Sequence, residues 1–346
     1  MKHQTTRYGE IPFYKIGTFG NTADAFISKK LFLEYKTKYS FPKKGDILIS
    51  ASGTIGRAVI YDGKPAYFQD SNIVWIDNDE TLVKNDFLFY AYSHVKWNTE
   101  HTTILRLYND NFRNTLIPLP PLNEQSAIAD ILSGLDRYLH ALDSLILKKE
   151  GVKKALSFEL LSQRKRLKGF NQAWQKVRLG DIANYLTSNL STEQITQQGK
   201  IKVYDVNNFI GYTDTTFISD KPYISIVKDG SVGRVRILPP KTNILSTMGA
   251  LIANHRTTTE FLFYLLSNFD FKNFTSGSII PHIYFKDYKE KTIFLPPLNE
   301  QSAIANILSA LDNEIASLKN KKRQFENIKK ALNHDLMSTK IRVLEK

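Results

Sequence analysis

The chain has 346 residues, enough for two domains, and its 42% hydrophobic and 12% aromatic content is ordinary for a folded protein. Cysteine is absent, which excludes disulfides, thiolate chemistry and cysteine-based zinc sites, and no apolar run is long enough to span a membrane. The formal net charge of +13 favours a polyanionic partner such as nucleic acid, because Lys and Arg at phosphates release counterions, although a merely basic surface is the alternative.

The first 118 residues predict a mixed α/β domain. They open without the apolar segment of a secretory signal, so we expect a cytoplasmic protein. Residues 46–51 (DILISA) predict a strand, and residues 53–57 (GTIGR) predict the tight turn that follows it. Residues 87–95 (FLFYAYSHV) predict a short helix.

The turn at residues 53–57 carries groups that suit contact with DNA. Gly53 lets the backbone approach a phosphate closely, and Thr54 and Arg57 can donate hydrogen bonds to a phosphate or, for Arg57, to a guanine edge. The alternative is a strand-to-strand turn with a solvent-facing arginine. A polar loop ahead of residue 119 adds a second set of candidates, which would otherwise be an ordinary surface loop. They are Thr103, Arg106, Tyr108 and Asn109.

Residues 119–170 begin with LPPLNEQSAIA and then predict one long helix, from about Asn123 to Arg166. The proline pair disfavours helix before it, Asn123 is a plausible N-cap, and Glu124 suits the positive end of the helix dipole. Such a helix would be about 65 Å long and needs a partner along its apolar seam. The alternative is that it packs onto its own domain.

The same order of elements returns in residues 171–294. Residues 223–227 (YISIV) predict a strand, residues 230–234 (GSVGR) repeat the glycine turn, and residues 261–269 (FLFYLLSNF) predict a short helix. As in the first half, the alternatives are a solvent-facing turn and an ordinary surface loop. The candidate DNA contacts of this half are Lys228, Ser231, Arg234, Arg236, Ser278, His282 and Tyr284.

The last stretch, residues 295–346, shows that the chain has an internal repeat of two copies. LPPLNEQSAIA recurs without a change at residues 295–305, and later matches keep one offset of 176 residues, as a duplicated domain-plus-helix unit would. The second helix is therefore the natural partner of the first, in an orientation that the pattern leaves open. The residues predicted to pair the helices are Ile131, Leu135, Leu142, Ile307, Leu311 and Leu318.

Two variable domains, each ending in LPPLNEQ and followed by a long helix, resemble the DNA-specificity subunit of type I restriction–modification enzymes. The resemblance implies target recognition domains at 1–118 and 171–294, and helical spacers at 119–170 and 295–346. It implies an α+β fold in which the helices pair as an antiparallel coiled coil with pseudo-twofold symmetry. It also implies that the chain reads an interrupted, two-part target in double-stranded DNA.

The same resemblance implies the partners: two modification subunits that methylate adenine with S-adenosylmethionine, and a restriction subunit that uses ATP and Mg. Those cofactors belong to the partners, so we expect none on this chain. The modification subunits are expected to dock on the repeated motif. The residues predicted for this interface are Leu122, Glu124, Gln125, Leu298, Glu300 and Gln301.

One departure from the family pattern concerns the first domain. Residues 174–182 (WQKVRLGDI) open the second domain and have no counterpart in the first, where Gly9–Tyr14 aligns with Gly199–Tyr204. We therefore expect a first domain shortened at its N-terminus, and a truncated or silent variant is one alternative function.

Sequence motifs for catalysis are missing. There is no Gly-x-x-x-x-Gly-Lys-Ser/Thr or Gly-x-Gly-x-x-Gly loop and no Asn/Asp-Pro-Pro-Tyr/Phe motif, and the seven histidines form no spaced cluster that would suit a metal. The sequence thus favours a recognition subunit without catalysis or metal. Two rivals are an enzyme with an unrecognised site and a scaffold whose helical hairpin spaces two domains that do not bind DNA.

Overall fold

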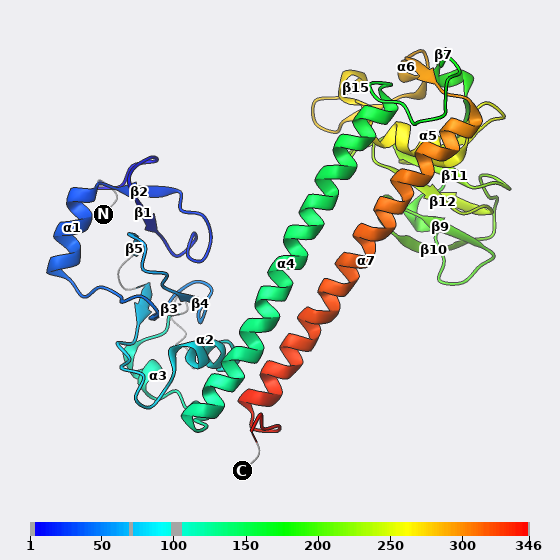
Figure 1. The fold of residues 1–346 in the computed structure, drawn as a ribbon. Coiled ribbons are helices and arrows are strands. Elements are labelled where there is room, and N and C mark those ends of the chain that lie inside the picture. Colours follow the sequence, from blue (N-terminus) through cyan, green and yellow to red (C-terminus); the bar gives the residue numbers. More distant parts are fainter. Residues whose placement is uncertain (1–3, 69–71, 98–105, 345–346) are drawn as a thin grey trace. The chain divides into compact units, whose positions relative to one another are not determined.

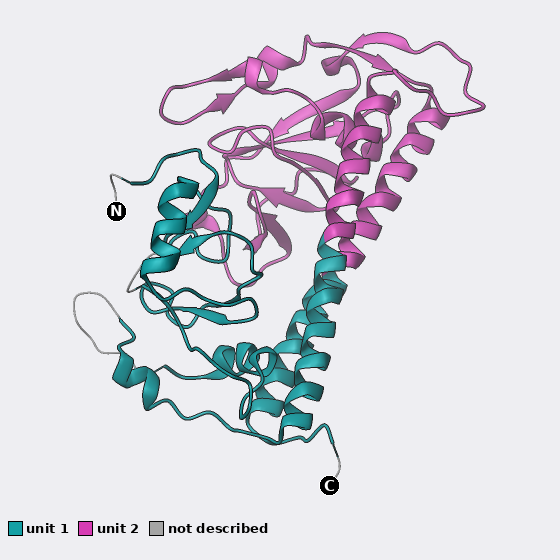
Figure 2. Ribbon diagram, turned by 60° about the vertical axis from the view of Figure 1, so that its left-hand side comes forward, with its two compact units in different colours: residues 1–143, 320–346 teal, residues 144–319 magenta. Residues whose placement is uncertain are grey.

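The computed structural model describes residues 4–68, 72–97 and 106–344, which belong to two compact units (Figures 1 and 2). Unit 1 consists of residues 1–143 and 320–346, and unit 2 of residues 144–319. Each unit contains one mixed α/β domain and part of both long helices, α4 (Leu122–Leu161) and α7 (Leu298–Met337).

The described residues of the domain in unit 1 form two small sheets. Its elements are β1 (Ile11–Tyr14), β2 (Ala25–Ile27), α1 (Lys29–Lys38), β3 (Ile47–Ser50), β4 (Ala58–Ile60), β5 (Tyr67–Phe68), β6 (Ile73–Trp75), α2 (Asn85–His94) and α3 (Asn109–Arg113). One sheet has the order β2-β1-β5, with β1 antiparallel to β2 and parallel to β5, and the other has the antiparallel order β4-β3-β6. Every residue of the central strand β3 is buried, and its isoleucines pack in one cluster with Leu88 and Tyr92 of α2.

The domain of unit 2 repeats these elements and adds to them. They are β7 (Gln175–Arg178), η1 (Leu179–Asp181), β8 (Ala183–Thr187), η2 (Thr192–Gln194), β9 (Ile201–Tyr204), β10 (Phe209–Thr213), β11 (Tyr223–Val227), β12 (Val235–Leu238), β13 (Thr242–Ile244), β14 (Met248–Ala253), α5 (Thr259–Ser267), η3 (Lys272–Phe274), β15 (Thr275–Ser276), β16 (His282–Ile283), α6 (Phe285–Tyr288) and β17 (Thr292–Leu295). The strand predicted at residues 223–227 is β11, and α5 confirms the predicted short helix.

Comparison of the two domains shows where unit 2 is larger. The sheet β10-β9-β13 has the pairing of β2-β1-β5, and the strands β12-β11-β14 match β4-β3-β6. In unit 2, β8 extends the second sheet beside β14, and β7 pairs with β17. Among the described residues of unit 1, no strand lies on the outer edge of β6, and residues 116–119, the counterpart of β17, form none. Among the described residues, β7 and β8 therefore have no counterpart in unit 1.

The pairing of α4 with α7 is antiparallel within each unit. In unit 1, Asp136 of α4 pairs with Lys329 of α7, and Asp143 further along α4 pairs with Lys322, which lies earlier in α7, at 2.7 Å. In unit 2 the same order continues, with Glu150 of α4 bound to Lys319 at 2.6 Å. A residue later in one helix thus always meets an earlier residue in the other, which confirms the predicted antiparallel pair.

Both helices end in the same way. Two residues after the end of α4, Gln163 has a left-handed φ angle of 62°, and two residues after the end of α7, Thr339 has one of 56°. A residue of this conformation stops a helix, because the next N–H turns back to satisfy a free carbonyl of the last turn. Lys165 accordingly donates its N–H to the carbonyl of Glu159 at 3.1 Å. The first helix therefore ends at Leu161 and not near Arg166 as predicted.

The buried face of the helices differs in part from the predicted seam. Ile131 is 40% exposed, and the adjacent Leu132, which sequence analysis did not select, is fully buried together with its counterpart Leu308. Leu132 packs with Phe87 of α2 and Leu336 of α7, so the helix turns its apolar stripe toward its own domain as well as its partner helix. Neighbouring helical residues point about 100° apart, and this second contact decides which of the two is buried. Of the other predicted pairing residues, Leu142 is buried, and Leu135, Ile307, Leu311 and Leu318 are half-buried.

None of the helices in the described ranges is both long enough and apolar enough to cross a lipid bilayer.

Candidate nucleic-acid interface

The glycine turn of unit 1 joins β3 to β4. Hydrogen bonds hold the residues at its base, and the residues at its tip are exposed to solvent. The N–H of Gly56 donates to the carbonyl of Ser50 at 3.0 Å, and the N–H of Arg57 donates to the Ser50 hydroxyl at 3.0 Å. Gly53 and Gly56 have φ angles of 65° and 84°, a region that favours glycine. A Cβ on Gly56 would lie 2.3 Å from the indole of Trp97, whereas Gly53 and Thr54 are exposed at the tip.

The turn of unit 2 has the same construction. Gly230 and Gly233 have φ angles of 83° and 81°, and the N–H of Gly233 donates to the carbonyl of Val227 at 2.9 Å. A Cβ on Gly233 would lie 2.6 Å from Phe271, while nothing lies within 4 Å of one on Gly230. In both units the second glycine therefore serves packing, and the first one, with the exposed Thr54 or Ser231 after it, leaves backbone accessible to a ligand.

The second set of candidates meets the first in each unit. Arg106 forms a β-bridge with Ser52, directly before the glycine turn of unit 1, and His282 forms one with Asp229 at the same place in unit 2. Backbone bonds close the junction, since Leu107 donates to Ala51 at 2.9 Å and Ile283 donates to Lys228 at 2.9 Å. Two segments that are far apart in the sequence thus form one surface in each unit, with Arg106 or His282 beside the turn.

Unit 2 places a row of aromatic and basic groups on this surface. His282 forms a 2.7 Å contact between its Nδ1 and the Asp229 carboxylate, and its ring lies nearly parallel to that of Tyr284, with centroids 6.5 Å apart. Lys286 lies 5.5 Å from the centroid of Tyr284, which is 49% exposed. Ser278 is exposed between β15 and β16. An exposed tyrosine face with a cation above it can stack on a base and bind a phosphate at once.

The arginines that follow the turns are held in place by polar groups that sequence analysis missed. Arg234 donates to the Asn207 side-chain oxygen at 3.0 Å, and Arg236 donates to the Asn207 carbonyl at 2.9 Å and lies over the ring of Tyr204. Arg57 donates to the carbonyl of Phe19 at 3.0 Å. A guanidinium has five N–H donors, so each of these arginines keeps donors for a phosphate or a guanine edge. The polar turn after β9, at residues 205–208, was the signal in the sequence that could have indicated Asn207.

The remaining predicted DNA contacts lie as follows. Tyr108, 41% exposed, precedes α3, and Asn109 is the exposed first residue of that helix. Lys228 is half-buried behind the turn of unit 2. Thr103 lies outside the described residues.

The predicted docking residues of the repeated motif need a correction. Only Leu122 and Leu298 face outward, at 39% and 48% exposure, because the carboxylates and amides of the motif are buried and used inside the protein. Glu300 accepts two hydrogen bonds from Arg166, at 3.2 and 2.6 Å, and one from the Trp174 indole at 3.0 Å. Glu124 is held in the same way by Arg342, whose guanidinium lowers the pKa of that carboxyl.

The glutamines fasten each long helix to its own domain. Gln125 accepts from the N–H of Lys84 at 2.7 Å and donates to the carbonyls of Leu82 and Pro120. Gln301 accepts from the N–H of Thr258 at 3.0 Å and donates to the carbonyls of Arg256 and Pro296. Each amide thus satisfies buried backbone groups at the start of α2 or α5. Glu124, Gln125, Glu300 and Gln301 are consequently structural and not free for a partner.

Replacing Gln301 with leucine should destabilise unit 2 by about 2–4 kcal/mol, because several backbone groups would lose a hydrogen bond to the buried amide. Urea unfolding followed by circular dichroism measures this change. Ser302→Leu, one residue further on the exposed face of α7, is the matched control and should cost less than about 0.5 kcal/mol. Equal stability of Gln301→Leu and the control would contradict this role of the amide.

Several lysines of each long helix form ion pairs with acidic residues of the partner helix. Lys149 contacts Glu314 at 2.8 Å, Lys153 contacts Asp312, and Lys319 contacts Glu150. Among the described residues, no group of three or more His, Asp or Glu side chains is arranged to hold a metal ion.

Comparison with known proteins gives a consistent result. The model of the family "Type I restriction modification DNA specificity domain" matches residues 1–149 and 171–327. A Haemophilus influenzae protein, named as a type I restriction enzyme specificity subunit, is 60% identical over 143 residues, which span 41% of this chain and only 37% of the relative. The MjaX specificity subunit of Methanocaldococcus jannaschii, also named as a type I restriction enzyme subunit, is 29% identical over 86% of this chain and 79% of its own length.

A solved structure supports the fold. The S subunit of a type I restriction–modification system from M. genitalium matches with a TM-score of 0.64 and 21% identity, over 97% of this chain and 91% of that one.

Proposed function

The chain belongs to the type I restriction modification DNA specificity family, and we propose that it reads a two-part DNA target for enzymes of that class. One observation supports this most. Each unit presents the same exposed construction, a glycine turn bridged to a second loop, but with different side chains on it. Arg106 in unit 1 stands where His282 stands in unit 2, so the two surfaces would read different bases.

The chemistry would come from partner subunits. We propose that modification subunits bring S-adenosylmethionine-dependent adenine methylation and that a restriction subunit brings ATP- and Mg-dependent translocation and cleavage. The outward-facing Leu122 and Leu298 remain the residues of the repeated motif that suit docking. This chain would contribute recognition and no catalysis, in the cytoplasm where its DNA and partners are.

Substitution of Arg234 tests the DNA contact directly. Arg234→Ala should weaken binding of the purified chain to a mixed-sequence duplex about tenfold, because one charged donor to phosphate is lost, and should lower the salt slope by about one unit. The fold should survive, since Arg234 is exposed and its partner Asn207 is exposed as well. Fluorescence anisotropy at several salt concentrations measures both quantities.

Arg323→Ala is the matched control for this experiment. Arg323 is an exposed arginine on α7 whose guanidinium donates to the side-chain oxygen of Asn320. Its loss should change affinity by less than about twofold, since only the long-range charge changes. Equal effects of the two substitutions would mean that binding follows net charge alone, and would contradict the proposed surface.

A further inference from the structure

Two neighbouring isoleucines are exposed at the tip of a hairpin in unit 2. The strands β15 and β16 pair antiparallel, and residues 277–281 connect them. This connection contains Ile279, which is 93% exposed, and Ile280, which is 54% exposed. Water solvates apolar side chains poorly, so a ligand that covers both residues gains the free energy of their burial.

The backbone fixes this tip beside the glycine turn of unit 2. Gly277 has a φ angle of 89°, and a Cβ there would lie 2.3 Å from the carbonyl oxygen of Ile280, so a side chain at this position would clash. Pro281, whose ring restricts φ, accepts a hydrogen bond at its carbonyl from the N–H of Gly230 at 2.9 Å. The tip and the glycine turn therefore belong to one surface.

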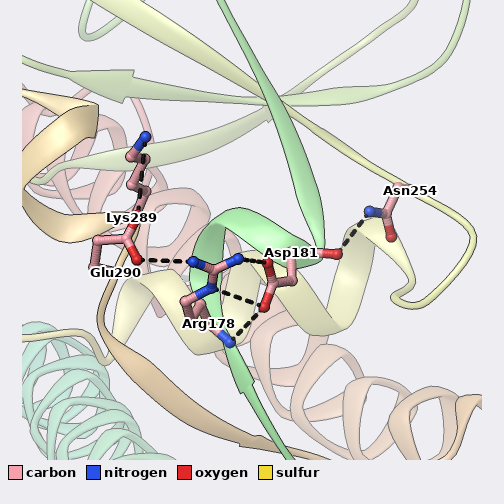
Figure 3. A network of polar contacts seen from close by, with 5 residues as sticks. All are labelled: Arg178, Asp181, Asn254, Lys289 and Glu290. Atoms are coloured by element: carbon pink, nitrogen blue, oxygen red, sulfur yellow. Dashed lines mark hydrogen bonds and ion pairs between the residues drawn. The ribbon is translucent and has the colours of Figure 1, made fainter.

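The segment that follows the hairpin is fixed to the domain by the polar contacts of Figure 3. Arg178 binds Glu290 at 3.1 Å and Asp181 at 2.8 Å, and the Asn254 amide donates to the carbonyl of Asp181 at 2.9 Å. The hairpin is thus held at the glycine turn and again after α6. A contact made by its tip needs little further ordering of the chain, which lowers the entropic cost of binding.

The charge around the tip favours a polyanion. The segment from Phe271 to Lys286 contains two lysines and one histidine but no Asp or Glu. In the glycine-turn segment, residues 228–236, Asp229 is the one carboxylate beside three basic residues, and it contacts His282 at 2.7 Å. An apolar tip in basic surroundings suits a groove of DNA, where phosphates flank the base edges. Lysine is by contrast depleted in protein–protein interfaces.

The base edges offer one group that suits an isoleucine. In the major groove, the C5-methyl group of thymine is apolar, whereas the other exposed groups donate or accept hydrogen bonds. An isoleucine side chain has no donor or acceptor, so its complement on a base edge is the thymine methyl group. The branched Cβ also restricts χ1, so the side chain loses little conformational freedom on contact.

We propose that Ile279 and Ile280 contact the C5-methyl group of thymine, so that the part of the target read by unit 2 includes at least one thymine. This inference rests on the proposed function of reading DNA and names one base that unit 2 reads. The hairpin tip would add apolar readout to the hydrogen bonds and phosphate contacts of the glycine turn.

Replacing thymine with deoxyuridine, which lacks only this methyl group, tests the proposal. The probe is the duplex that the full chain, in complex with its modification subunit, selects from a randomised library, synthesised with one thymine replaced at a time. Replacement of the contacted thymine should weaken binding about fourfold, the effect of burying one methyl-sized group. With the Ile279→Ala, Ile280→Ala variant, the same replacement should change affinity by less than about 1.5-fold, since the shortened side chains no longer cover the methyl group. Fluorescence anisotropy measures both affinities.

Two variants serve as controls. Ile279→Val with Ile280→Val keeps branched apolar side chains and should retain the preference for thymine over deoxyuridine. Leu147→Ala shortens another apolar side chain of unit 2, which is 68% exposed on α4, and should leave both the affinity and the preference unchanged.

The outcomes separate this proposal from the proposed function. Equal preference for thymine in the double-alanine variant and the unchanged chain would overturn the proposal, as would a selected target without thymine in the part read by unit 2. If the variant bound every duplex more weakly, but with its thymine preference intact or with none in the unchanged chain, the tip would not read the methyl group. Failure of the unchanged complex to bind any duplex would instead contradict the proposed function itself.

Discussion

Exchanging residues 1–118 for the corresponding domain of another family member should change one part of the DNA target and leave the other part unaltered. The physical reason is that each domain carries its own core and its own glycine-turn surface. In unit 1, Leu48 of β3 and Tyr61 pack with residues of that domain alone, and Arg106 is bridged to Ser52 within it. Specificity should therefore follow the domain from which the bridged pair of loops comes.

Selection from a randomised duplex library, made with the chain in complex with its modification subunit, measures this exchange. The junction should lie ahead of Leu119, so that Gln125 and Glu124 keep their positions on α4. The reciprocal exchange of residues 171–294 is the control and should alter the other part only. If either exchange altered both parts together, the two domains would not read DNA independently.

The second large effect is expected from a charge at the buried helix positions. Leu308→Asp should unfold unit 2, because an ionised carboxylate in the core has no partner there and costs more than about 4 kcal/mol. Leu132→Asp should do the same to unit 1, since Leu132 is fully buried between α2 and α7. Thermal unfolding followed by circular dichroism, and co-purification with the modification subunit, measure the two consequences.

Leu147→Asp and Ile328→Asp are the matched controls on the same helices. These side chains are 68% and 51% exposed, so a carboxylate there stays in water and should change stability by less than about 1 kcal/mol. If the Leu308 and Leu132 variants remained as stable as these controls, the helix pair would not be part of the core of either unit.

The sequence predicts the elements and the symmetry of the chain well, because both rest on local pattern. The exact repeat of LPPLNEQSAIA places two helices that begin at Leu122 and Leu298, one offset apart. Strand β11 coincides with the predicted run of five apolar and small residues. The alignment of Gly9–Tyr14 with Gly199–Tyr204 identifies β1 and β9 as equivalent strands.

What the sequence does not predict depends on tertiary contacts. The bridges from Arg106 to Ser52 and from His282 to Asp229 join segments more than fifty residues apart, and no local pattern encodes them. Glu124 looks like a solvent-facing residue of a first helical turn, and only the returning Arg342 makes it internal. Leu132 and Ile131 are equally apolar neighbours, so the choice between them needs the position of α2.

The glycine turns combine both cases. Gly53 was predicted to let the backbone approach DNA, whereas Gly56 and Gly233 leave room for the rings of Trp97 and Phe271, which a repeat in the sequence cannot reveal. A Cβ on Gly230 would meet nothing within 4 Å, and one on Gly53 would meet Ile16 at 3.5 Å, so both exposed first glycines remain candidates for phosphate contact.

The most direct test of the two-part reader is to co-express this chain with its modification subunit and to map methylated adenines across the host genome. The account predicts methylation at one interrupted motif, with two different specified parts separated by a fixed gap. Methylation at a single uninterrupted motif, or none despite a stable complex, would contradict the claim that both units read DNA.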